Sequence, residues 1–136
     1  DVLDYYEADA FTPVLADATS GGNTSATTLT GGFVRNGKQV TVWINGVNVD
    51  TTGMTAGNDV WITGLPFTSW STVVAIGAVY LTNATFSGYV TPFLSGNVTS
   101  FRLGDVVSAT GLDFLIVSEL TDDTTDFYIT LTYRIA

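Results

Sequence analysis

The chain has 136 residues, with no histidine or cysteine and 4 Lys and Arg against 13 Asp and Glu, a net charge of −9 at pH 7. Histidine is the usual general base near neutral pH, and His and Cys supply most nucleophilic triads and zinc sites, so we expect no enzyme, catalytic residue, metal or cofactor. Nucleic acid and membrane insertion are disfavoured as well, because phosphate contacts need clustered Lys and Arg and no apolar run reaches the ~20 residues of a membrane helix.

Strand-like runs separated by Gly, Asn, Asp and Ser follow one another along the chain, with little helical periodicity. The clearest run is 40–45, where Val40, Val42 and Ile44 alternate with polar residues and Trp43. The expected strands cover 11–16, 29–35, 40–45, 60–63, 72–81, 84–90, 98–103, 114–119 and 126–135. This pattern predicts an all-β fold, an antiparallel two-sheet sandwich that is jelly-roll-like and has about eight to nine strands.

The expected organisation is an N-terminal connecting segment at 1–10 and a single β-sandwich domain at 11–136. Because the chain begins with Asp1 and not Met, we expect it to be a fragment or a processed product. Asn36-Gly37 lies between two predicted strands, which predicts a tight hairpin with Gly37 at positive φ.

Hydrophobic residues make up 46% of the chain and charged residues 12%. A small domain with so little charge is expected to bury apolar surface against other copies of itself. A compact monomer covered by Thr, Ser and Asn is the alternative.

Three segments resemble the C-terminal domains of bacteriophage tail-fibre proteins. Residues 5–13, Tyr-Tyr-Glu-Ala-Asp-Ala-Phe-Thr-Pro, are similar to the family's Tyr-Glu-x-Gly-x-aromatic-Thr-Pro opening, although Asp9 stands where the family usually has Gly. Residues 31–42 resemble its Gly-x-aromatic hairpin, with Arg35-Asn36-Gly37 in place of Lys-Ile/Val-Gly. Residues 62–69 resemble its Thr-Gly-Leu-Pro-Phe element. The likeness covers roughly the first half of the chain, and the second half matches only in character.

The resemblance implies a homotrimeric β-sandwich on the exposed surface of a virion. Such a domain contacts other virion proteins and binds a host-cell surface polysaccharide, or caps the fibre. Two alternatives stay open: a capsid-attached decoration or head-fibre protein that stabilises the shell, and a carbohydrate-binding module of a secreted enzyme. Modules of the last class are commonly monomeric, so the native mass separates them from the other two.

Aromatic side chains are the candidates for sugar contact, because an exposed ring stacks on the apolar face of a pyranose. The candidate ligand-binding residues are Trp70, Phe67, Ser69, Trp43 and Asn45, with Tyr80 and Tyr89 as further aromatics. Trp70 follows Pro66 in a loop-like stretch, and Trp43 shares the polar face of its strand with Asn45. The alternative is that these rings pack in the core or at a subunit interface, as we expect for Trp61.

Glu119, Asp122, Asp123 and Asp126 form the densest acidic cluster. A hard cation wants several such oxygen ligands, and a glycosidase needs two carboxylates across a cleft. The spacing matches no EF-hand loop and nothing indicates a cleft. The cluster is therefore expected to be a solvated turn before the last strand.

Overall fold

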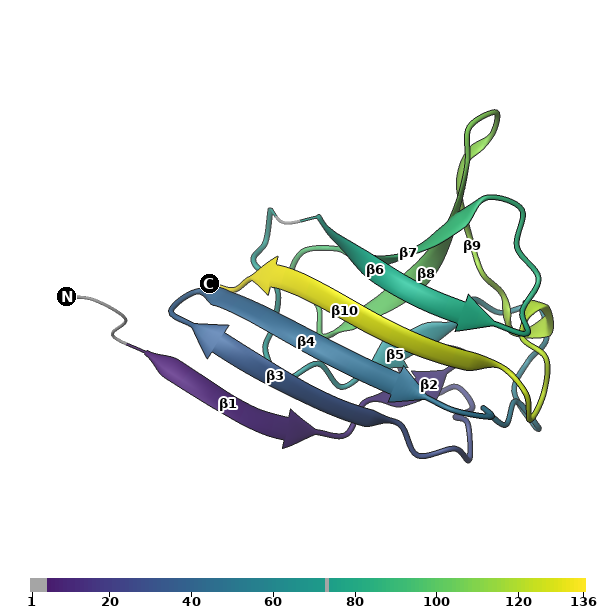
Figure 1. Cartoon of the computed structure of the whole chain (residues 1–136), viewed down its shortest axis with the longest axis horizontal. Helices are drawn as coiled ribbons and strands as arrows, with labels where there is room; N and C mark the ends of the chain where they lie inside the picture. The colour runs from purple at the N-terminus through teal and green to yellow at the C-terminus, as the bar shows by residue number, and fades with distance from the viewer. Residues whose placement is uncertain (1–4, 73) are drawn as a thin grey trace.

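The computed structural model describes residues 5–72 and 74–136, which form strands, turns and one short 3-10 helix (Figure 1). The elements are β1 (Tyr6–Phe11), β2 (Val14–Ala16), β3 (Thr30–Asn36), β4 (Gln39–Gly46), β5 (Trp61–Thr63), β6 (Ala75–Thr82), β7 (Tyr89–Leu94), β8 (Ser100–Val107), β9 (Gly111–Phe114), η1 (Val117–Glu119) and β10 (Asp126–Arg134). The prediction of an all-β antiparallel fold is confirmed. No helix within the described ranges is long and apolar enough to cross a membrane.

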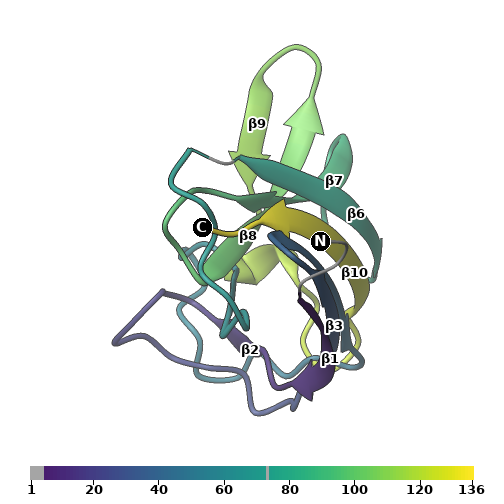
Figure 2. The same cartoon turned by 90° about the vertical axis from the view of Figure 1, so that its left-hand side faces the viewer.

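The strands form one ten-stranded sheet in the order β1-β3-β4-β10-β6-β7-β8-β5-β2, with β9 added to β8. The sheet curls so that β1, β3, β4, β10 and β6 face the β7, β8, β5 and β2 half (Figure 2). The sequence predicted two sheets in a jelly-roll-like sandwich. The structure instead joins the two halves by hydrogen bonds through β6.

Strand β6 changes partner along its length. Its longer part pairs with β10, from Thr82 opposite Asp126 to Gly77 opposite Leu131. Its first two residues, Ala75 and Ile76, pair with β7 instead. The strand therefore crosses from one half of the sheet to the other, and it separates from β10 at one end and from β7 at the other.

The core lies between the two halves of the sheet, because successive side chains along each strand point alternately to its inner and outer faces. Along β10, residues at odd positions are buried and those at even positions are half-buried or exposed, and β4 shows the same period of two. The largest fully buried side chains are Phe101, Phe127, Leu15, Leu29, Ile44, Ile62, Leu94, Leu103, Leu115 and Leu131. The intervening positions carry polar residues together with Trp43 and Tyr128, and they form the outer face of β4 and β10.

Several predicted strand boundaries differ from the observed ones. The run 11–16 is split into the end of β1 and β2, because Pro13 has no N–H to donate to a ladder. The run 84–90 is irregular as far as Gly88, apart from an isolated bridge between Ala84 and Leu120. The Gly88 N–H donates to the Asp105 carboxylate at 2.8 Å, and β7 begins at Tyr89. The run 114–119 contains only the end of β9 and then η1.

The predicted connecting segment 1–10 overlaps β1, which pairs with β3 along its whole length. Residues 1–4 of that segment, and Val73 of the predicted strand 72–81, lie outside the described residues.

Candidate functional site

An aromatic groove lies on the outer face of the β4, β10 and β6 strands. Its lining residues are Trp43, Asn45, Ala78, Val79, Tyr80, Tyr128, Ile129 and Thr130, around a volume of about 420 Å³. The register explains why they meet: Asn45 and Tyr80 both lie opposite Tyr128, and Trp43 and Ala78 both lie opposite Thr130. The groove therefore follows from strand pairing, with side chains from three strands.

The aromatic rings of this groove are exposed to solvent. The exposed fractions are 45% for Trp43, 65% for Tyr80 and 44% for Tyr128. The two tyrosine rings have centroids 6.2 Å apart at 39°. A Cβ at Gly32 on the neighbouring strand would overlap the Trp43 indole, so this glycine leaves room for the ring against β3. The groove offers flat apolar surfaces beside the Asn45 amide and the Thr130 hydroxyl.

The other three candidate residues do not join Trp43 and Asn45. Ser69 is 2% exposed, and its hydroxyl donates to the Ser95 carbonyl at 2.6 Å. The Phe67 ring packs edge-on against Phe33, with centroids 5.2 Å apart. Both side chains therefore support the fold at these positions.

Trp70 is half-buried beside the end of β10, where its backbone N–H donates to the Arg134 carbonyl at 2.9 Å. The Arg134 guanidinium lies 4.4 Å from the centre of the indole, and the Lys38 ammonium lies 5.5 Å from it. Cations over an aromatic face are attracted by its electron-rich surface. The structure therefore places Trp70 with two cations, where the sequence predicted a ring open to a sugar.

A second hollow, the basic pocket, lies next to these cations. It is lined by Asn36, Lys38, Gln39, Val74, Ala75, Ile76, Thr132, Tyr133 and Arg134, with a volume of about 610 Å³. It occurs where β6 has turned from β10 toward β7. Thr132 and Arg134 share the even-numbered outer face of β10 with Tyr128 and Thr130. The basic pocket and the aromatic groove thus lie on one face of the sheet.

Tyr89 and Trp61 do not line the aromatic groove, although Tyr89 lines an adjoining hollow together with Tyr80 of the groove. Tyr89 is exposed on β7. Trp61 is half-buried under Arg102, whose guanidinium is 4.7 Å from the Trp61 ring and pairs with Asp59 at 2.8 Å.

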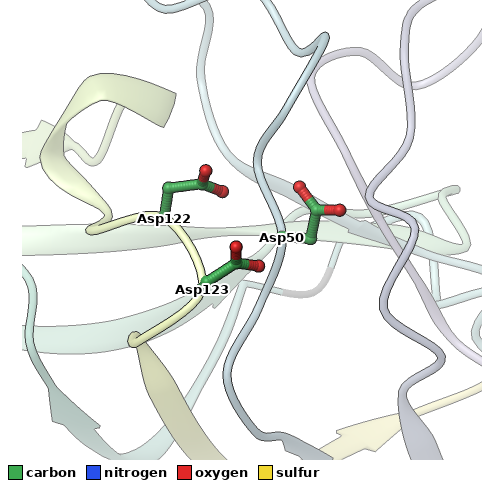
Figure 3. A group of neighbouring side chains, drawn as sticks. All are labelled: Asp50, Asp122 and Asp123. Atoms are coloured by element: carbon green, nitrogen blue, oxygen red, sulfur yellow. The ribbon is translucent and has the colours of Figure 1, made fainter.

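The acidic residues separate into different places (Figure 3). Asp122 and Asp123 meet Asp50 from another loop, and one carboxylate oxygen of each lies within 4.8 Å of the others. Glu119 accepts the Ile116 N–H at 2.9 Å, and Asp126 accepts the Asn48 N–H at 2.7 Å. The predicted cluster of four therefore becomes a group of three that includes a residue the sequence did not indicate.

The Asp122 carboxylate holds two loops together. Asp122 accepts hydrogen bonds from the Thr51 N–H at 2.6 Å and the Thr51 hydroxyl at 3.1 Å. These bonds hold the pKa of Asp122 below its usual range. Each of the three residues offers one oxygen to a hard cation, but on Asp122 such an ion would compete with donors already in place.

Some contributors to the outer face were missed by the sequence analysis. Tyr128 and Arg134 could have been found from the alternation of β10, since both are in phase with the threonines of its polar face. Lys38 and Asp50 gave no such signal, because each joins its site through a loop.

Neither protein-family models nor curated protein sequences match the chain. Among solved structures, it is similar to the tailspike protein gp208 of Dettilon, with a TM-score of 0.67 and 18% sequence identity. The match covers 95% of this chain and 24% of the tailspike, so the chain corresponds to about a quarter of that protein. The comparison establishes that the chain shares its fold with one part of a phage tailspike.

Proposed function

We propose that this chain is a non-enzymatic domain of a bacteriophage tail appendage, exposed on the virion, which binds a polysaccharide of the host surface. The fold that it shares with part of a tailspike supports a place on a phage tail. The resemblance of its first half to tail-fibre domains supports the same assignment. The observation that carries the binding role is the exposed aromatic groove.

The groove suits a saccharide for physical reasons. The faces of Trp43, Tyr80 and Tyr128 can stack on the C–H faces of sugar rings, and neighbouring polar groups can bond the hydroxyls. Adjacent strands lie ~4.8 Å apart, so the groove from β4 to β6 is about 10 Å wide, enough for a sugar ring and its substituents. An open groove of this kind fits a chain that passes over the surface.

The absence of catalysis is part of the proposal. The described residues that line the aromatic groove include no carboxylate. Glu119, Asp122 and Asp126 each accept a hydrogen bond from a backbone N–H of a loop or turn. Their positions support a structural role, so a bound polysaccharide is expected to remain uncut.

Assembly as a homotrimer completes the proposal. Tyr89, Val106 and Leu112 lie in one cross-strand row on β7, β8 and β9. Tyr89 and Leu112 are exposed, which gives the chain an apolar row that adjoins the aromatic groove at Tyr80. Trp43, Asn45 and Tyr128 do not line the hollow beside Tyr89, so contact between copies along this row would leave this part of the groove open. Three weak sites engaged together bind far more tightly than one.

An array of purified capsular polysaccharides and O-antigens tests the binding role. We expect the intact chain to bind at least one of them, and Trp43→Ala to weaken that binding more than tenfold while the melting temperature stays close to that of the parent. Val47→Ala removes a similarly exposed apolar side chain outside the groove and should bind normally. Failure to bind any polysaccharide, or equal binding by Trp43→Ala, would contradict the proposal.

A further inference from the structure

We propose that the basic pocket binds the carboxylate of an acidic sugar, so that the polysaccharide recognised by this domain is anionic. This inference rests on the proposed function and adds the chemical class of the ligand. Three observations support it. They are the shape of the basic pocket, the lack of an ion pair to its two cations among the described residues, and the position of the pocket on the same sheet face as the aromatic groove.

The pocket is a product of the change of partner in β6. Pairing of β6 with β10 ends at Gly77 opposite Leu131, and Ala75 and Ile76 then pair with β7. Beyond Leu131, β10 no longer pairs with β6; its next backbone contact is the Trp70 N–H, which donates to the Arg134 carbonyl, and the space of about 610 Å³ lies at this end of the strand. Val74 and Ile76 form an apolar wall, while Asn36 and Gln39 supply amides. Such a mixture of apolar and amide surface suits a sugar.

The basic pocket carries positive side chains, although the whole molecule has a net negative charge. The chain has 4 cationic side chains and 13 acidic ones, yet Lys38 and Arg134 both line this one pocket. Within residues 5–72 and 74–136, the one ion pair joins Arg102 to Asp59. Lys38 and Arg134 therefore meet no carboxylate of the described chain. Two cations that line one pocket and form no ion pair within the described part of the chain give a local positive potential that attracts an anion.

Trp70 positions the two cations. Its indole lies under the Arg134 guanidinium and near the Lys38 ammonium, at 4.4 and 5.5 Å from the ring centre. A guanidinium held on an aromatic face keeps its N–H groups directed outward at its edge, where they can donate two parallel hydrogen bonds to a carboxylate. Trp70 thereby acts on the ligand through Arg134, as a positioning residue.

The basic pocket and the aromatic groove lie along the same outer face of β10. Tyr128 and Arg134 are six positions apart on the outer face of β10, a distance of about 20 Å at roughly 3.4 Å per residue. Thr132 lies between them and bonds the Thr41 hydroxyl at 2.8 Å. A saccharide chain along β10 could therefore stack on Trp43 and place a carboxylate between Lys38 and Arg134.

The test uses hexagalacturonate and its full methyl ester, which have the same sugar backbone with and without negative charge. Binding is followed by the amide signals of the intact isotope-labelled chain in NMR. We expect the acid to shift the signals of Lys38, Gln39, Thr132 and Arg134 in a saturable way, and to bind at least tenfold more tightly than the ester. Its affinity should fall as salt is added, because the contact is between opposite charges.

Matched variants separate charge from shape. Lys38→Gln combined with Arg134→Gln should lose at least tenfold in affinity for hexagalacturonate. The charge-preserving pair Lys38→Arg with Arg134→Lys should lose less affinity than the Gln pair, because both charges remain although the two parallel hydrogen bonds of Arg134 are removed. Equal binding of acid and ester, shifts confined to other parts of the chain, or unchanged affinity in the Gln variant would each overturn the inference.

The polysaccharide array separates this inference from the proposed function. If the domain binds neutral polysaccharides through Trp43 and ignores hexagalacturonate, the inference is wrong and the proposed function stands. If hexagalacturonate binds at the basic pocket while no surface polysaccharide does, the pocket is an acidic-sugar site and the proposed function fails.

Discussion

Asp17 shows how one carboxylate can organise two loops. Its side chain is 3% exposed and accepts the Asn23 side-chain amide at 2.9 Å, the Asn23 backbone N–H at 2.7 Å and the Thr55 N–H at 2.7 Å. The Asn23 side-chain bond is the largest cause that lowers the pKa of Asp17 to about 2. The carboxylate therefore stays ionised and bonded well into the acid range.

This lowered pKa gives a pH-dependent prediction. The folded state holds the Asp17 carboxylate ionised at a lower pH than the unfolded chain, so its contribution to stability is complete above about pH 4 and is lost as the pH falls toward 2. Asp17→Asn should melt at a lower temperature than the parent at pH 6, and this difference should shrink between pH 4 and pH 2. Melting curves across that range measure it; a difference that stays constant would contradict the assignment.

A second residue-scale prediction concerns Tyr133. Its ring is buried in the core, and its hydroxyl donates to the Phe67 carbonyl at 3.0 Å. Burial raises the pKa of this hydroxyl to about 12, so it remains a donor over the ordinary pH range. Tyr133→Phe leaves the carbonyl without its donor and should cost about 1–3 kcal/mol of unfolding free energy in urea titrations. Tyr6→Phe, on an exposed ring, is the control and should cost nothing measurable.

At the scale of elements, the β3–β4 hairpin confirms a prediction and refines it. Gly37 has φ +57°, as the sequence predicted. Asn36 pairs with Gln39, however, so the central residues of the turn are Gly37 and Lys38, one position later than an Asn-Gly turn would have them. Positive φ at the first central residue alone is the pattern of a type II′ turn.

The conformation of Gly37 predicts the effect of a substitution there. No atom lies within 4 Å of a Cβ built on Gly37, so the cost of a side chain comes from the backbone and not from a clash. Gly37→Val should lower the unfolding free energy by about 1 kcal/mol or more, because a β-branched residue is strained at positive φ. Gly37→Asn should cost less, since Asn tolerates this region. Equal stability of the Val variant and the parent in urea would show that the turn is elsewhere.

Local patterns in the sequence were enough to predict part of the fold. The alternation of β4 and the Asn-Gly pair gave a strand and a hairpin, because both depend on neighbours in the chain. Residues 72–81 are nearly all apolar, and nothing in that run marks the change of partner at Gly77, which depends on β10 and β7.

The same limit applies to the candidate sites. Trp43 and Asn45 belong to one strand face, so the sequence could pair them. Asp50 lies near Asp122 because the neighbouring residue Thr51 donates a hydrogen bond to Asp122, and these two residues are 71 positions apart in the chain. The sequence predicted an exposed ring at Trp70. In the structure this ring lies beside Arg134, because Ser69 forms a bridge with Ile135 just after β10. Contacts of this range have no local signature.

At the scale of the whole molecule, the expected homotrimer makes a prediction about the apolar row on β7, β8 and β9. Native mass spectrometry of the intact chain should give three times the 14.4 kDa mass of one copy. Leu112→Asp should shift the protein to the monomer, because a carboxylate buried at a contact between copies is costly. Thr132→Asp, on the outer face of β10, should leave the trimer intact. A stable monomer of the parent chain at micromolar concentration would contradict this assembly.

The distribution of charge along β10 has a consequence for motion near a surface. Asp126 begins the strand close to the loops of Asp50 and Asp122, and Arg134 ends it beside Lys38, eight positions or about 27 Å away. This separation gives the strand a permanent dipole moment, although the chain as a whole is an anion. The electric field of an anionic polysaccharide layer exerts a torque on this dipole, which turns the Arg134 end toward the layer. The torque acts within about one Debye length, ~8 Å in physiological salt, so rotation toward the layer precedes contact and fades as ionic strength rises.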